Sequence, residues 1–166
     1  MFRSHTCNQL NKDNVGEEVI LSGWIHRRRD HGDLIFLDLR DRYGFTQIVA
    51  DPSHNESAHK IAEELRSEFV VMVKGTVRAR PDGMQNKNID SGEVEVILNE
   101  IEILNRSKTP PFEIDVTTDP NEEIRLKYRY LDLRRERMKN NIIFRHRFIK
   151  RLRDHMDGLG FVEIET

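Results

Sequence analysis

The sequence predicts a mainly β fold: a five-stranded barrel with one helix between strands 3 and 4, then an extended linker and a long C-terminal helix. Three observations lead to this prediction. Apolar and polar residues alternate in several short segments of the first hundred residues. One segment among them has helical spacing instead. A second, longer helical segment, rich in basic residues, follows a Pro-Pro pair.

The first two strands are predicted from strict alternation. Residues 19–26 alternate and end in three arginines, 27–29. A turn signal at 31–33 precedes residues 34–40, in which every second residue is a large aliphatic. If those aliphatic residues face the core, Phe36 lies on the outer face of the strand.

The remaining barrel elements follow in order. A short connection at 41–44 leads to a strand at 45–50, and residues 53–66 form an amphipathic helix. A β-branched strand at 69–80 contains Gly75, where we expect a bulge, and a last strand covers 94–104. Three strands, a helix and two strands is the element order of an OB-fold, a Greek-key barrel whose strand 2–3 face typically takes single-stranded nucleic acid.

Three regions are predicted along the chain: the barrel over 1–106, a linker or hinge over 107–134, and a separate start of a domain over 135–166. The last region contains a helix at about 135–156 and the beginning of a strand at 161–166. That strand has no partner left in the sequence, so we expect a truncated chain. The helical spacing predicts these buried positions in the helix: Ile142, Ile143, Phe148, Ile149 and Leu152.

Composition excludes several classes of protein. The chain has 166 residues, a net charge of −2 and one cysteine, so it has no internal disulfide framework and fits a reducing cytoplasm. It has neither a membrane-length apolar run nor the apolar core of a secretory signal. Residues 121–155 carry twelve basic and five acidic side chains. This block either faces a polyanion or is the solvated face of a charged helix.

The outer face of the predicted barrel carries the strongest binding signal. Phe36 is either a packing residue or a platform for a base, and stacking is worth ~1–3 kcal/mol per base. Gln47 is expected across the hairpin at about the same distance from the turn, and its amide can donate and accept. Arg27, Arg28 and Arg29 supply positive charge for phosphates and further base contacts. Together these residues favour RNA or single-stranded DNA as the partner.

Catalytic chemistry is not indicated. The seven histidines never reach metal-ligand spacing with a second cysteine, and the paired glutamates lie on solvated stretches. The sequence also has no phosphate-binding loop or nucleophile elbow. The residues alone therefore predict a binding module with no catalytic and no metal-binding residues.

Five stretches carry a resemblance to a known family. Residues 23–32 (GWIHRRRDHG) and 34–44 (LIFLDLRDRYG), together with Gln47, resemble the anticodon-binding domain of bacterial-type aspartyl-tRNA synthetases. Residues 92–96 and 125–135 are similar to the same family, the latter to its hinge. Residues 159–166 (LGFVEIET) resemble the start of class II synthetase motif 1.

The resemblance implies roles for individual residues. Phe36 would stack on the middle anticodon base, uridine, which Gln47 would hydrogen-bond, and Arg29 would contact the bases. Glu95 would accept hydrogen bonds from the first base, guanine, with Glu93 as a near alternative. The resemblance also implies supporting residues for the tRNA backbone: Arg27, Arg28 and Arg78. For the third base it implies His31 and Gly83, a pair similar to the enzymes that charge both aspartate and asparagine tRNAs.

The family enzyme activates aspartate with ATP and Mg²⁺ and transfers it to tRNA, and it works as a cytoplasmic homodimer. Its ATP and aspartate motifs lie beyond motif 1, so this chain is expected to be inactive alone and to bind no cofactor. Gly160 and Phe161 would belong to the motif 1 dimer interface, tRNA is the expected partner, and no membrane is involved. Two alternatives remain open. One is a free-standing OB-fold or accessory tRNA-binding protein, and the other is an interaction protein that uses the helix at 135–156.

Overall fold

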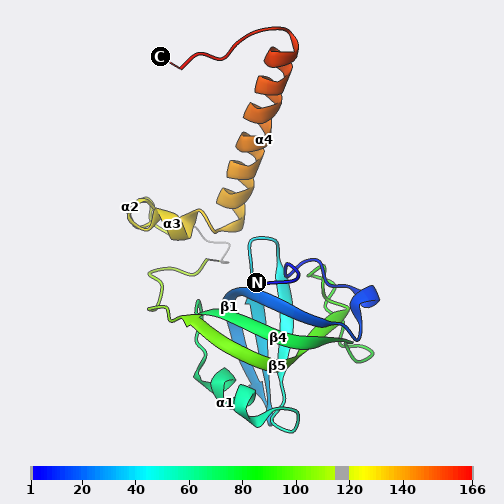
Figure 1. Cartoon of the computed structure of the whole chain (residues 1–166). Coiled ribbons are helices and arrows are strands. Elements are labelled where there is room, and N and C mark those ends of the chain that lie inside the picture. The colour runs from blue at the N-terminus through cyan, green and yellow to red at the C-terminus, as the bar shows by residue number, and fades with distance from the viewer. Residues whose placement is uncertain (1, 115–119, 166) are drawn as a thin grey trace. The chain divides into compact units, whose positions relative to one another are not determined.

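The computed structural model describes residues 2–114 and 120–165 (Figure 1). The chain divides into two compact units, Met1–Pro110 and Pro111–Thr166. The first unit contains the barrel and the second contains the long helix. The sequence placed the end of the barrel region at residue 106, four residues before the end of the first unit.

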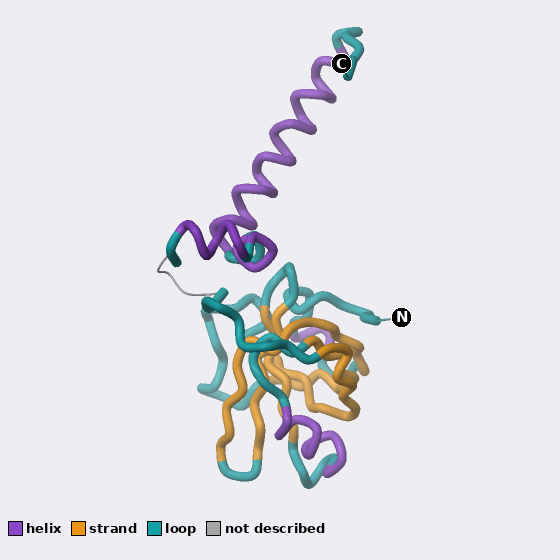
Figure 2. Tube along the Cα trace, turned by 90° about the vertical axis from the view of Figure 1, so that its left-hand side faces the viewer, coloured by secondary structure: helices purple, strands orange, loops and turns teal. Residues whose placement is uncertain are grey.

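The first unit is a closed five-stranded barrel (Figures 1 and 2). The strands follow the order β1-β2-β3-β5-β4 around the barrel, and α1 lies at one end of it, between β3 and β4 in sequence. The predicted mainly β OB-fold is thereby confirmed. The bounds are β1 Glu18–His31, β2 Leu34–Arg40, β3 Phe45–Ala50, α1 Glu56–Glu64, β4 Val70–Ala79 and β5 Val94–Asn105.

The long strand β1 joins both halves of the barrel. Its first half pairs antiparallel with β4, and its second half pairs antiparallel with β2 after a register shift between Ile25 and Arg27. Closure comes from β5, which runs antiparallel to β4 and makes a short parallel pairing with β3. Every strand of the barrel therefore has a pairing partner on both sides.

The first strand is longer than the sequence predicted. The three arginines do not leave the strand but continue it to His31, and β2 begins at Leu34. The connection is a two-residue turn in which Gly32 has a φ of +62°. Glycine at the first central position lets the turn match the twist of the two strands, so the hairpin extends past the arginines.

Large aliphatic side chains from all five strands fill the barrel. The alternation predicted for β2 is confirmed, because Ile35, Leu37 and Leu39 are at most 4% exposed. Ala58 and Ala62 of α1 join the same core, and Asn55 caps the helix by accepting a hydrogen bond from the Ala58 backbone N–H. The small side chains allow α1 to approach the barrel closely.

Gly75 lies at a β-bulge, as predicted. The β4–β5 register shifts between Lys74 and Gly75, and a Cβ at Gly75 would lie 2.2 Å from the carbonyl oxygen of Ile97. Only glycine allows the two strands to approach this closely.

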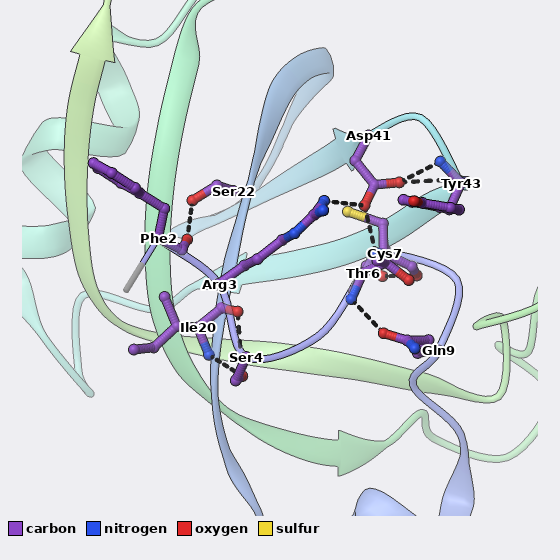
Figure 3. A network of polar contacts seen from close by, with 12 residues as sticks. Phe2, Arg3, Ser4, Thr6, Cys7, Gln9, Ile20, Ser22, Asp41 and Tyr43 are labelled. Carbon is purple, nitrogen blue, oxygen red and sulfur yellow. Dashed lines mark hydrogen bonds and ion pairs between the residues drawn. The ribbon is translucent and has the colours of Figure 1, made fainter.

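The N-terminal segment is tied to the barrel by polar contacts (Figure 3). The Ser4 backbone N–H donates to the carbonyl of Ile20 at 2.8 Å. The buried carboxylate of Asp41 accepts from the Cys7 backbone N–H at 2.9 Å and from the Tyr43 N–H at 2.7 Å. Burial, reinforced by the Asp41 charge, raises the pKa of the Cys7 thiol. Asp41 thus links the N-terminal segment to the β2–β3 connection.

The second unit contains α2 Glu122–Lys127, α3 Arg129–Asp132 and α4 Glu136–Gly158. Asp132 is fully buried, and its carboxylate pairs with the guanidinium groups of Arg125, Arg129 and Arg135. Because an unpaired buried charge is strongly unfavourable, these ion pairs account for a carboxylate at this depth.

Two expectations for this unit were wrong. The positions of α4 predicted to be buried are not, since none of its side chains is buried and Ile142, Phe148 and Leu152 are about half exposed. Helical spacing indicates which face can be covered but not what covers it. The predicted strand is absent from residues 161–165, where the chain has no regular structure. No helix in the described part of the chain is long and apolar enough to cross a membrane.

We expect Gly75→Ala to destabilise the barrel by about 1–3 kcal/mol, because the added methyl group would collide with the Ile97 carbonyl. Denaturant unfolding followed by tryptophan fluorescence would measure the change. Gly158→Ala is the matched control, since a Cβ there meets no atom within 4 Å. An unchanged barrel stability in Gly75→Ala would contradict the close approach.

We expect limited trypsin digestion to separate the two units by cleavage between Lys108 and Lys127, two exposed lysines on either side of their boundary. The barrel should survive as a folded fragment, detectable by mass spectrometry and by its own unfolding transition. Simultaneous degradation of both units would show that they depend on each other.

Candidate nucleic-acid interface

The outer sides of all five strands carry a group of polar side chains around one aromatic ring. Strand register places Arg29 opposite Phe36, Arg27 opposite Asp38, and Asp38 opposite Gln47. Cross-strand partners point to the same side of a sheet, so these side chains share one surface. The next strand after β3 around the barrel is β5, and its Glu95 lies opposite Arg78 of β4. We call this surface the outer face: Arg27, Arg29, Phe36, Asp38, Gln47, Arg78 and Glu95.

Phe36 is the aromatic residue of this face. Its neighbours Ile35 and Leu37 point into the barrel and are buried, while Phe36 itself is partly exposed. Its cross-strand partners are Arg29 on β1 and Val49 on β3. A ring held at its sides by a cation and an aliphatic residue, with part of its surface exposed, can accept a stacked base.

Gln47 lies closer to the hairpin turn than the sequence analysis expected. The four-residue connection sets Arg40 opposite Phe45, so Phe36 faces Val49 and Gln47 faces Asp38. The loop length fixes the register, and Gln47 therefore lies diagonal to Phe36, two residue pairs nearer the turn. Both side chains nevertheless lie on the same face.

A chain of hydrogen bonds crosses the outer face from strand to strand. Arg29 Nη2 donates to Asp38 Oδ1 at 2.6 Å and makes a longer contact of 3.4 Å with Gln47 Oε1. Gln47 Nε2 donates to Glu95 Oε2 at 2.8 Å. Arg78 Nε donates to Glu95 Oε1 at 2.7 Å. Four side chains predicted to contact the anticodon region are thus brought together in one network.

The two candidate glutamates differ in their surroundings. Glu95 is 3% exposed, and each of its carboxylate oxygens accepts one hydrogen bond. Glu93 is exposed and forms an ion pair of 2.7 Å with Lys12. Glu95, and not Glu93, is therefore the glutamate that contacts Gln47.

The other predicted residues are more dispersed. Arg27 and His31 are exposed and share the outer face by their register. Arg28 has the opposite orientation along β1, with bonds to Asp30 and to the carbonyl of Glu63. The hydrogen bond from Arg28 holds the pKa of the Asp30 carboxyl below its ordinary value. The structure does not join Arg28 to the network.

Gly83 and the pair Gly160–Phe161 lie outside the strands. Gly83 is exposed in the β4–β5 loop and has a φ of +80°. Gly160 lies two residues after the end of α4 and has a φ of +85°. The Phe161 N–H donates to the Met156 carbonyl at 3.1 Å. This is a Schellman arrangement, which closes the helix and leaves the Phe161 side chain 58% exposed.

Two charged residues of this region were not among the predicted site residues. Alternation places Asp38 on the same face of β2 as Phe36, as the register confirms, but the sequence analysis gave it no role. Arg80 follows β4 with the parity of Arg78 but is only 7% exposed. No sequence signal indicates that an arginine just beyond a strand end is buried.

Two family models match the chain in separate stretches. Residues 19–104 match the OB-fold nucleic acid binding domain, and residues 121–166 match class II tRNA synthetases of the D, K and N group. The first match contains the whole outer face. The second contains the three helices of the second unit.

Curated relatives align along nearly the whole chain. The chain is 53% identical over 165 residues to an aspartate–tRNA(Asp/Asn) ligase of Protochlamydia amoebophila, covering 99% of the chain and 28% of that protein. It is 52% identical over 166 residues to the ligase of the same name from Moorella thermoacetica, again with 28% of that protein covered. The chain thus spans little more than a quarter of the length of these relatives.

Solved structures show the same arrangement of elements. The asparaginyl-tRNA synthetase of Pyrococcus horikoshii superposes with a TM-score of 0.83 at 25% identity, over 99% of this chain and 38% of that one. An aspartyl-tRNA synthetase of Entamoeba histolytica, at 19% identity, shares the fold with a TM-score of 0.81, over 96% of this chain and 38% of that one. From the barrel, its outer face and these matches, we conclude that the chain belongs to the OB-fold nucleic acid binding domain family and continues into the start of a class II tRNA synthetase domain.

Proposed function

We propose that this chain is the tRNA anticodon-binding region of an aspartate–tRNA ligase. The observation that carries the proposal is the outer face, where a partly exposed Phe36 lies beside Gln47 and Glu95 at the surface of an OB-fold barrel. The identity of 50–53% to ligases named for aspartate supports the amino acid.

Six of the seven residues of the outer face have a role in contacting RNA in this proposal. Phe36 stacks on the middle anticodon base, uridine, and Gln47 bonds the edge of that base. Glu95 accepts from the first base, guanine, whose N–H groups suit a carboxylate. Arg29 contacts the bases, and Arg27 and Arg78, which are also exposed, face the RNA backbone.

The parent enzyme would attach aspartate to tRNA in the cytoplasm as a homodimer, with Gly160 and Phe161 in the motif 1 interface. Class II synthetases use ATP and Mg²⁺ for this reaction. Among residues 2–114 and 120–165, no group of three or more His, Cys, Asp or Glu side chains could hold a metal ion. The residues present do not fit a Mg²⁺ site, and we assign them no chemical step.

We expect Phe36→Ala to weaken binding of an RNA stem-loop with the anticodon GUC by ~1–3 kcal/mol, because the stacking surface is lost. Titration by fluorescence anisotropy would measure it. The unfolding free energy should fall by much less than the ~3–5 kcal/mol typical of a core phenylalanine, since Phe36 lies on the outer face.

The matched control for this prediction is Phe144→Ala, which removes a 72% exposed aromatic ring from α4. It should leave stem-loop binding unchanged. If the unmodified 166-residue chain bound stem-loops of unrelated anticodon sequence with equal affinity, that result would contradict the proposal and favour a general single-strand binder.

We further propose that the parent enzyme accepts both aspartate and asparagine tRNAs. The two tRNAs share the first two anticodon bases and differ at the third, cytidine or uridine. His31 ends β1 on the outer face, and its imidazole can donate or accept. Gly83 presents no side chain that could reject either pyrimidine, and its φ of +80° disfavours replacement by another residue.

We expect the chain to bind stem-loops with GUC and GUU anticodons with affinities within about threefold, or ~0.7 kcal/mol. Competition binding of the two RNAs to the same protein sample would measure the ratio. A GAC stem-loop, changed at the middle base, should bind more weakly than both. A preference above about tenfold for GUC would contradict relaxed specificity.

A further inference from the structure

Arg80 holds an unused hydrogen-bond donor beside the outer face. Its backbone N–H donates to the Glu93 carbonyl at 3.0 Å, and its Nε donates to the Val94 carbonyl at 2.9 Å. The other end of the guanidinium differs, because Nη2 is buried and has no hydrogen-bond partner. An unsatisfied buried N–H of a charged group is costly, so its retention calls for a physical reason.

The charges around Arg80 are those of the outer face. Burial lowers the pKa of Arg80, and the carboxylates of Glu95 and Asp38 oppose that shift. The cation of Arg29 is also within electrostatic range. The guanidinium of an arginine is effectively always protonated in proteins, so Arg80 is a cation at neutral pH. A spare donor therefore lies within electrostatic range of the two carboxylates, two residues along the chain from Arg78, whose cross-strand partner is Glu95.

RNA binding as proposed above would remove donors from those carboxylates. In the free chain, the amide N–H of Gln47 donates a hydrogen bond to Glu95 Oε2. When Gln47 turns to the edge of a base, Glu95 Oε2 loses that donor, while Arg78 still holds Oε1. A carboxylate accepts about four hydrogen bonds, so Glu95 can bind a second arginine and still accept from guanine.

We propose that Arg80 is a positioning residue for recognition of the first anticodon base. Its spare Nη2 donates a hydrogen bond to Glu95 Oε2 in place of Gln47 when Gln47 moves to the RNA. Two arginines then hold the Glu95 carboxylate in place, and its remaining lone pairs point to the guanine N–H groups. This inference rests on the proposed function and adds to it a residue that does not itself contact RNA.

The test compares Arg80→Met in the 166-residue chain with Lys60→Met, which removes the same charge from the exposed side of α1. Binding is measured with GUC and AUC stem-loops, which differ at the first base. We expect Arg80→Met to lower GUC affinity roughly tenfold, the effect of one hydrogen bond to a charged group. AUC affinity should change no more than it does in Lys60→Met.

Two further measurements separate positioning from a structural role. In a Glu95→Gln background, Arg80→Met should cost less than about threefold, because the two residues act through one contact. The unfolding midpoint of the free chain should fall only by the loss of the Nε bond to the Val94 carbonyl, since Nη2 stabilises nothing before RNA binds. Binding is measured at a temperature at which every variant is folded. Arg80→Lys retains the charge, but one nitrogen replaces the separate Nε and Nη2 donors. It cannot bond the Val94 carbonyl and Glu95 at the same time, so it should also lose guanine preference.

Three results would overturn the inference while leaving the proposed function intact. They are equal losses for GUC and AUC, full additivity with Glu95→Gln, and a loss of affinity that follows a loss of stability. If the unmodified chain does not prefer GUC over AUC, the proposed function fails, and the role of Arg80 fails with it.

Discussion

Closure of the barrel is the constraint from which the rest of the structure follows. Once β5 pairs with both β3 and β4, every strand has one side turned to a sealed interior and one side turned outward. The interior is filled mainly by apolar side chains, and the buried Thr46 donates its hydroxyl to the Cys7 carbonyl, so most polar residues of the strands lie on the outside. Several of these polar side chains pack closely enough to lose contact with water, so they must hydrogen-bond to one another. The network from Asp38 to Arg78 is the result of that crowding.

Under the proposed function, this arrangement makes RNA binding an exchange of hydrogen-bond partners. In the free chain, Gln47 and Glu95 already bond each other, so an RNA base would gain only the difference between new and old hydrogen bonds. Net affinity from such an exchange would be modest, as is usual for hydrogen bonds formed in water. Discrimination would be larger, because a wrong base would break the Gln47–Glu95 bond without offering matching donors and acceptors in return. Phe36, which gives up no hydrogen bond, can supply affinity without that compensation.

Much of the fold could be predicted because alternation in a strand is local. The parity of Phe36, the bulge at Gly75 and the order of elements all follow from neighbouring residues. The features that could not be predicted depend on the register between strands or on distant contacts. Gln47 was misplaced by two residue pairs because the register depends on how the hairpin connection closes. The burial of Arg80 depends on packing around the end of β4. The exposed stripe of α4 shows the same limit, since spacing identifies a face without identifying its neighbour.

The tie between the N-terminal segment and Asp41 has a consequence for how the barrel forms during synthesis. Residues 3–7 leave the ribosome before Asp41, whose carboxylate emerges only after β2 is complete. Until then the segment can be held only through Ser4 and Ile20 of β1, and the strand that closes the barrel follows more than fifty residues later. Early strands therefore stay open-edged for several seconds at ordinary translation rates of ~5–20 residues per second. The charged arginines and aspartates along β1 and β2 would keep those temporary edges from pairing with neighbouring chains.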